Sequence, residues 1–214
     1  MKKSLILLLS LLSVTSTFSQ YQTKYNISYS QPYQVDSSEY FIIGPNINET
    51  NKTKFNVSRG RGYTWTNLIF YNSKTKESKL IFNSSPLLVS QVSSLYNRAS
   101  SWSYSVQEKN SSFLTSHCVL LLVQEDENKN GIIDDDDITS LYIISKTGTN
   151  LTKISPAGAH VKAYTLSQDE KTLLMRIQKD MNKDNKYFDE DEIFYQINLD
   201  KDFSKISGFE IKLK

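Results

Sequence analysis

Residues 119–155 read V-L-L-L-V-Q-E-D-E-N-K-N-G-I-I-D-D-D-D-I-T-S-L-Y-I-I-S-K-T-G-T-N-L-T-K-I-S, and this stretch decides the fold. Two short apolar runs flank an acidic segment, and a third run follows a Lys-Thr-Gly turn. Apolar runs of this length, bounded by polar turn residues, are typical of buried β-strands. The stretch therefore predicts a strand, an acidic loop, a strand, a turn and a further strand.

The same order occurs a second time in the chain. Residues 172–207 read T-L-L-M-R-I-Q-K-D-M-N-K-D-N-K-Y-F-D-E-D-E-I-F-Y-Q-I-N-L-D-K-D-F-S-K-I-S, and Asp126 then corresponds to Asp180. A fainter third copy lies at residues 66–82, T-N-L-I-F-Y-N-S-K-T-K-E-S-K-L-I-F, without an acidic loop before it. These similarities predict an internal repeat built from short strands.

Short apolar or alternating runs separated by polar turns continue through the chain, which predicts an all-β, mostly antiparallel fold. No segment has the pattern of an amphipathic helix of about twelve residues or more, and residues 91–115 fit either a long loop or weak edge strands. The predicted strands are Tyr40–Ile43, Thr66–Asn72, Ser78–Phe82, Cys118–Val123, Ser140–Ser145, Leu151–Ile154, Val161–Leu166, Thr172–Ile177, Ile193–Asn198 and Ile206–Ile211.

Residues 161–177, V-K-A-Y-T-L-S-Q-D-E-K-T-L-L-M-R-I, resemble the strand, S-x-D-x-K turn and strand of TolB-like β-propeller repeats. The preceding L-T-K-I-S-P-A-G resembles the end of one propeller blade, and the resemblance extends over residues 118–214 and more weakly over 40–82. It implies a binding or scaffolding surface outside the cytoplasm and transfers no catalytic residue. Three blades are fewer than the usual four to eight, so a partial propeller, an oligomer-closed propeller and a β-sandwich with propeller-like hairpins all remain open.

Residues 126–137, D-E-N-K-N-G-I-I-D-D-D-D, have the spacing of a twelve-residue calcium loop of the EF-hand or dockerin kind. Gly131 stands at position 6, where the chain turns sharply, and the flanks predict strands rather than the helices of an EF-hand. The alternative is an acidic turn without metal that keeps a sheet edge soluble. The predicted Ca²⁺ ligands are Asp126, Asn128, Asn130, the Ile132 carbonyl, Asp134 and Asp137.

The second acidic segment, D-M-N-K-D-N-K-Y-F-D-E-D-E, keeps positions 1, 3 and 5 but then slips by one residue. Tyr187 and Phe188 interrupt the usual spacing of the apolar anchor, so we expect a weaker site or a solvated turn. The predicted ligands here are Asp180, Asn182, Asp184, Asp189 and Glu192.

The N-terminus reads M-K-K-S-L-I-L-L-L-S-L-L-S-V-T-S-T-F-S, which predicts a secretory signal peptide at residues 1–19 without a lipoprotein cysteine. The remainder divides into an N-terminal β region, residues 20–116, and two β repeats, residues 117–214, expected to form one domain. No other segment is apolar for eighteen residues, so no membrane span is predicted and the mature chain is expected in the periplasm or outside the cell.

Charge argues against a nucleic-acid partner. Without Lys2 and Lys3, 23 of the 25 basic residues remain against 23 acidic residues, so the mature chain is about neutral. The acidic residues concentrate in the two predicted loops, with seven at 125–137 and six at 180–192. These clusters favour a cation as ligand.

Catalytic patterns are sparse. Cys118 is expected to be a buried core residue, and His160 is expected at a turn, on the surface or bonded to backbone. We therefore predict a calcium-stabilised binding or scaffold module whose partner is an unknown protein or glycan, with oligomerisation possible. A carbohydrate-binding module with exposed Tyr63, Trp65 or Trp102 is the alternative, and a metal-dependent hydrolase is a third.

Overall fold

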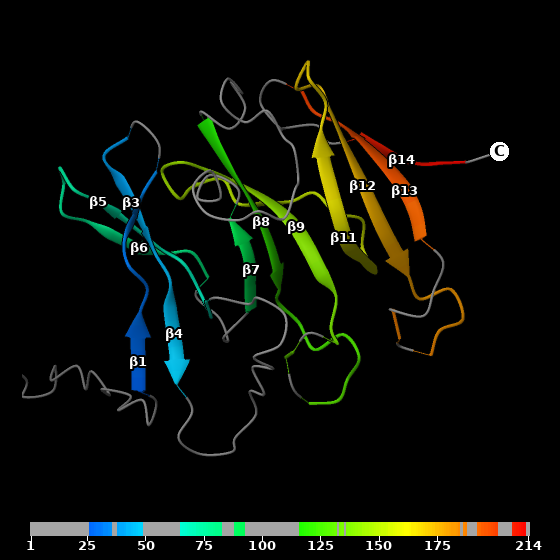
Figure 1. Ribbon diagram of the computed structural model, residues 1–214, viewed down its shortest axis with the longest axis horizontal. Helices are drawn as coiled ribbons and strands as arrows, with labels where there is room; N and C mark the ends of the chain where they lie inside the picture. Colours follow the sequence, from blue (N-terminus) through cyan, green and yellow to red (C-terminus); the bar gives the residue numbers. More distant parts are fainter. Residues whose placement is uncertain are drawn as a thin grey trace, which may run out of the picture.

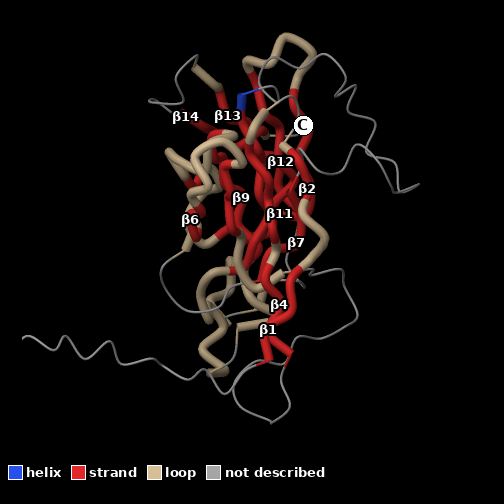
Figure 2. Tube along the Cα trace, turned by 90° about the vertical axis from the view of Figure 1, so that its left-hand side faces the viewer, coloured by secondary structure: helices blue, strands red, loops and turns tan. Residues whose placement is uncertain are grey.

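The computed structural model describes residues 26–35, 38–48, 65–82, 88–92, 116–131, 133–134, 136–184, 186–187, 192–200 and 207–212. These residues contain fourteen β-strands, β1 to β14, and every pairing between the strands is antiparallel. They form three four-stranded sheets and one two-stranded ribbon (Figures 1 and 2). The predicted all-β fold built from antiparallel sheets is thus confirmed.

The first sheet, called here the N-terminal sheet, has the strand order β2-β3-β5-β6. Its strands are β2 (Tyr33–Gln34), β3 (Tyr40–Ile43), β5 (Ile69–Asn72) and β6 (Ser78–Leu80). Beside it lies the ribbon of β1 (Asn26–Tyr29) and β4 (Pro45–Asn48). Because β4 follows β3 after one residue, Gly44, the chain passes directly from the sheet into the ribbon.

The central sheet has the order β7-β8-β9-β10. Its strands are β7 (Leu88–Val92), β8 (His117–Val123), β9 (Thr139–Ser145) and β10 (Thr152–Lys153). The strand β7 precedes residue 116 in the chain and pairs with β8, with a register shift between Val89 and Gln91. This pairing joins the predicted N-terminal and C-terminal regions within one sheet.

The C-terminal sheet has the order β11-β12-β13-β14. Its strands are β11 (Ala159–Leu166), β12 (Thr172–Lys179), β13 (Glu192–Asn198) and β14 (Ser207–Ile211). In both the central and the C-terminal sheet, neighbours in sequence are neighbours in space, and an acidic loop joins the second and third strands. Both sheets therefore have the same simple meander topology.

The three sheets lie side by side with the central sheet in the middle, as Figure 1 shows. Along β8, Cys118, Leu120 and Leu122 belong to a hydrophobic core shared with the N-terminal sheet. Val119 and Leu121 belong to a second core shared with the C-terminal sheet. Since successive side chains of a strand point to opposite faces, an unbroken apolar run is what a strand between two cores requires.

All ten strands predicted from the sequence are present, with ends that differ by at most a few residues. Cys118 is fully buried, as expected. The expected turn position of His160 was wrong: the residue lies in β11 and is 6% exposed. Among the residues that the structure describes, no helix has the length and apolar character needed to cross a membrane.

Candidate functional site

The two acidic loops lie at the same end of the molecule. The first acidic loop, residues 124–138, joins β8 to β9, and the second acidic loop, residues 180–191, joins β12 to β13. In Figure 1 they are the green and orange loops at the lower ends of the central and C-terminal sheets. This placement follows from topology, because β8 and β12 both run toward that end.

In the first half of the first acidic loop, side-chain oxygens accept hydrogen bonds from backbone N–H groups of the same loop. The N–H of Asn130 donates to Oδ1 of Asp126 at 3.0 Å and to Oδ1 of Asn128 at 2.9 Å. The N–H of Gly131 donates to Oδ2 of Asp126 at 2.7 Å. The backbone turns at Lys129 and Gly131, whose φ angles are 61° and 86°. The side-chain oxygens at positions 1 and 3 are thus held on the inside of one tight turn.

The second acidic loop has the same arrangement in its described half. The N–H of Asp184 donates to Oδ1 of Asp180 at 3.1 Å and to Oδ1 of Asn182 at 2.9 Å. Lys183 takes the left-handed conformation with a φ of 64°, as Lys129 does at the equivalent place. A positive φ is uncommon for a residue with a Cβ, so its presence at the same place in both loops points to one shared turn geometry.

Asp137 closes the first acidic loop on itself. Its Oδ1 accepts the N–H groups of Glu127 at 3.0 Å and Asn128 at 3.2 Å, and its Oδ2 accepts the N–H of Asp134 at 3.0 Å. The residue is 0% exposed. A carboxylate offers about four lone-pair sites, so these three bonds leave room for about one further partner.

The surroundings of the Asp137 carboxylate change its pKa. Burial raises the pKa of Asp137, and the charges of Asp134 and Asp126 raise it further. The N–H groups of Asp134 and Asn128 act in the opposite direction and lower the pKa. The net effect is a raised pKa, so the negative charges that gather here are incompletely compensated by the protein itself.

The charges of both acidic loops act on Tyr187. It belongs to the second loop, is 6% exposed, and its pKa is raised by burial and then by the charges of Glu127, Asp180 and Asp137. Glu127 and Asp137 belong to the first loop, so the tyrosine lies within electrostatic reach of both. Sequence reasoning missed this role and treated Tyr187 as a break in the pattern. The available signal was a pair of large aromatic residues, Tyr187 and Phe188, inside a strongly acidic segment.

The structure brings part of the predicted ligand set together. Asp126, Asp134 and Asp137 are electrostatic neighbours, and the backbone N–H of Asn128 donates to Oδ1 of Asp137. Asn130 lies in the same turn and is exposed. Ile132 and Asp189 lie outside the described residues. Over the described part of the chain, no three His, Cys, Asp or Glu side chains form a group that would hold a metal ion.

Glu192 is placed differently from the other predicted ligands. It is the first residue of β13, and its Oε2 lies 3.4 Å from Nε of Arg176 on β12. Both side chains are about two-fifths exposed, at 42% and 41%. The described interaction of Glu192 is therefore an ion pair on the sheet rather than a contact in the loop.

Trp65 and His160, considered above as a sugar-stacking residue and a turn residue, are both buried. Trp65 is 8% exposed and packs near Tyr33, with ring centroids 6.0 Å apart, so its indole is unavailable for stacking on a sugar. Tyr63 and Trp102 lie outside the described residues. Nδ1 of His160 accepts the N–H of Thr139 at 3.2 Å, which ties β11 to the start of β9.

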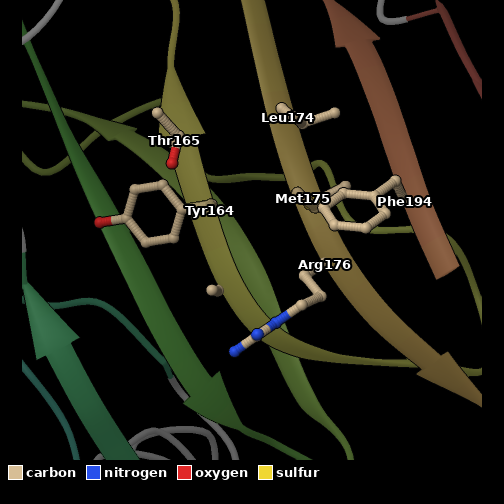
Figure 3. Close-up of a pocket in the computed structure, with 7 residues that line it drawn as sticks. Tyr164, Thr165, Leu174, Met175, Arg176 and Phe194 are labelled. Carbon is tan, nitrogen blue, oxygen red and sulfur yellow. The ribbon is translucent and has the colours of Figure 1, made fainter. Parts of the chain in front are cut away.

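A shallow hollow of about 270 Å³ lies on the C-terminal sheet (Figure 3). Figure 3 shows Leu174 and Arg176 on β12, with the ring of Phe194 beside them on β13. The residues around it are Ala163, Tyr164, Thr165, Leu174, Met175, Arg176 and Phe194. Its lining is mostly apolar, with one guanidinium group.

Comparison with known proteins gives little. No family model matches the chain. A search of curated proteins also found no match. Among solved structures, the crystal structure of the tricorn protease is similar over 78% of this chain at 10% identity and a TM-score of 0.38. The match spans 16% of that protein's chain, and a likeness at this level supports no inference about function.

Proposed function

We propose that the protein is a calcium-stabilised, all-β binding or scaffold module that works outside the cytoplasm. In this proposal calcium is structural: it occupies the first acidic loop and, more weakly, the second. The three four-stranded sheets are propeller-like blades that present a binding surface. The predicted signal peptide is the basis for the location.

The shared turn geometry of the two acidic loops is the observation that carries the proposal. In each loop a backbone N–H at position 5 donates to the side-chain oxygens of positions 1 and 3. This holds oxygens of Asp and Asn at alternate positions on the inside of the turn. Ca²⁺ prefers six to eight hard oxygen ligands of this kind, at about 2.3 to 2.6 Å.

The charge of the first acidic loop supports the same proposal. Residues 125–137 contain seven acidic side chains and one lysine. Asp137 is buried among them with a raised pKa. A divalent cation would offset this repulsion and also lower the free energy of the folded state. Sites with few strong ligands suit the calcium concentrations found outside cells, at affinities of about 10⁻⁴ to 10⁻³ M.

The test is calcium titration of the chelator-treated protein, followed by calorimetry and by thermal unfolding. Calcium at about one hundred times the dissociation constant contributes about 2.7 kcal/mol at one site, which is a rise in melting temperature of about 5 to 10 °C for a chain of this size. Asp126→Ala should abolish the tighter binding event and Asp180→Ala the weaker one. Glu77→Ala, which removes an exposed carboxylate from the β5–β6 turn, serves as the matched control.

An unchanged melting temperature at about 100 mM calcium, about one hundred times the weakest expected dissociation constant, would exclude a structural role for the ion. Equal stabilisation by calcium in wild type, Asp126→Ala and Asp180→Ala would mean that calcium binds outside these loops. Magnesium at the same concentration separates specific coordination from charge screening, because Mg²⁺ demands a smaller octahedral site and gives up its water reluctantly.

A further inference from the structure

Asn130 and Gly131 form the one Asn-Gly pair of the sequence, and they lie at the turn of the first acidic loop. The side-chain amide of an asparagine reacts with the backbone nitrogen of the next residue when that nitrogen attacks Cγ, because the attack closes a five-membered ring. A side chain on the next residue hinders this attack, so glycine is the most permissive neighbour. Both residues are exposed to solvent, which supplies the water that the reaction consumes.

The turn itself requires the glycine. Gly131 has a φ of 86°, in the left-handed region that glycine adopts without steric cost. Chain neighbours aside, no heavy atom of the described residues lies within 4 Å of the position that a Cβ would take on Gly131. The space beside the glycine is therefore open. The residue that shapes the loop also leaves its own nitrogen accessible to the side chain of Asn130.

A carboxylate is placed to accept the proton that this nitrogen has to lose. The N–H of Gly131 donates to Oδ2 of Asp126 at 2.7 Å. Hydrogen bonds to an ionised acceptor are short and strong, and this one directs the N–H at the carboxylate. A group within hydrogen-bond distance of the proton that it removes meets the geometric requirement for a general base. Asp126 therefore favours attack by the nitrogen of Gly131.

The second acidic loop shows that the product of such a reaction fits the turn. Its position 5 is Asp184, whose N–H donates to Asp180 at 3.1 Å and to Asn182 at 2.9 Å. The N–H of Asn130 makes the two equivalent bonds at 3.0 and 2.9 Å. The same turn thus forms with an aspartate at position 5. Conversion of Asn130 to aspartate gives the first loop the residue that the second loop already has.

We propose that Asn130 is a site of spontaneous deamidation in the folded protein. The backbone nitrogen of Gly131 bonds to Cγ of Asn130, Asp126 accepts the N–H proton, and the proton passes to the side-chain nitrogen, which leaves as ammonia. The product is a succinimide ring. Water then opens the ring at Cγ to give aspartate, or at the main-chain carbonyl carbon to give isoaspartate. The net change consumes one water and releases one ammonia.

The modification changes the charge of the first acidic loop. Residues 125–137 contain seven acidic side chains, and deamidation adds one more negative charge. In the calcium loop proposed above, the ligand at position 5 changes from an amide to a carboxylate, and the affinity of such loops depends on the charge of their ligands. Isoaspartate instead adds a methylene to the backbone and lengthens the turn. This consequence rests on the proposed function, whereas the reaction does not.

The test follows the purified wild-type chain in chelator at neutral pH over several weeks by peptide mapping. Mass spectrometry detects a gain of nearly one dalton and locates it, and fragmentation separates aspartate from isoaspartate. Asn128 and Asn182 are internal controls, because each lies in an acidic loop and precedes a lysine. We expect Asn130 to react at least about tenfold faster, which corresponds to a barrier lower by about 1.4 kcal/mol. A rate at Asn130 no higher than at the two controls would overturn the proposal.

Two variants test the part of Asp126. Asp126→Asn removes the base and should slow the reaction at Asn130 about tenfold or more. Asp126→Glu keeps a carboxylate, so its rate should lie closer to that of wild type. An unchanged or higher rate in Asp126→Asn would exclude proton transfer to Asp126. Because chelator is present throughout, failure of this reaction and failure of the calcium titration are separate results.

Discussion

The indole ring of Trp65 lies directly against Gly44, so that a Cβ added to Gly44 would overlap the ring atoms. Gly44 is the residue between β3 and β4, and Trp65 is buried in the core between the N-terminal and central sheets. The missing side chain of one residue therefore makes the space for the largest side chain of that core.

Gly44→Ala should lower the free energy of unfolding by about 1 to 3 kcal/mol or more, because the indole has to move within a packed core. Gly158→Ala is the comparison, since Gly158 has a φ of 64° and open space around its Cβ position. That variant should cost only about 1 kcal/mol, from the left-handed conformation alone. Urea unfolding followed by tryptophan fluorescence measures both, and equal losses would contradict the overlap.

Alkaline pH should destabilise the protein through Tyr142. Burial raises the pKa of Tyr142 to about 12 from 10.0, with smaller contributions from Glu125 and Glu127. The pKa of Tyr142 is higher in the folded protein than in the unfolded chain. Its contribution to the free energy of unfolding is therefore complete below pH 10 and is lost as the pH rises toward 12. Between pH 9 and pH 11.5 the loss is about 2 kcal/mol.

Tyr142→Phe should remove this part of the pH dependence. The variant loses the hydrogen bond from the Tyr142 hydroxyl to Oε1 of Gln124, at 2.5 Å, and is therefore somewhat less stable at neutral pH. Its stability should fall less than that of wild type between pH 9 and pH 11.5, by about 2 kcal/mol. Parallel pH profiles for the two proteins in urea titrations would show that Tyr142 ionises normally.

Acid should weaken the β11–β12 turn through Asp169. Its Oδ1 accepts the hydroxyl of Ser167 at 2.5 Å and the N–H of Lys171 at 3.2 Å, and these bonds lower the pKa of Asp169. The contribution of the charged Asp169 to stability is thus present above pH 3.8, the ordinary pKa, and is lost as the pH falls through the lowered pKa. Asp169→Asn should reduce the melting temperature at pH 7, and the difference from wild type should shrink as the pH falls below 3.8. A constant difference would argue against the charged form.

The fold was largely predictable from the sequence because strands between two cores leave unbroken apolar runs. The run at 118–123 and the similar run at 140–145 could be assigned with no knowledge of their partners. Four strands were missed, namely β1, β2, β4 and β7. They are two to five residues long, and β7 shifts register after Val89, which breaks the alternation on which the prediction depends.

The acidic loops were predictable only as local patterns. Positions 1, 3 and 5 follow from spacing, since alternate residues of a tight turn face the same backbone N–H. Nothing local indicates that the charges of Glu127 and Asp137 act on Tyr187, because this depends on how the two sheets are placed. Nor does the spacing show that Glu192 pairs with Arg176, which is a cross-strand relationship set by the register of β12 and β13.

Asp137 should stabilise the first acidic loop even without metal, because its carboxylate accepts three backbone N–H groups. Asp137→Ala leaves those donors without their acceptor, and with chelator present we expect a loss of about 2 to 3 kcal/mol, since solvent reaches part of the loop. Asp136→Ala, which removes the exposed neighbouring carboxylate, should change stability by less than about 0.5 kcal/mol. Chemical denaturation in chelator separates the two cases. A full effect of Asp137→Ala that appears only with calcium would mean that the residue acts through the ion and not through the loop backbone.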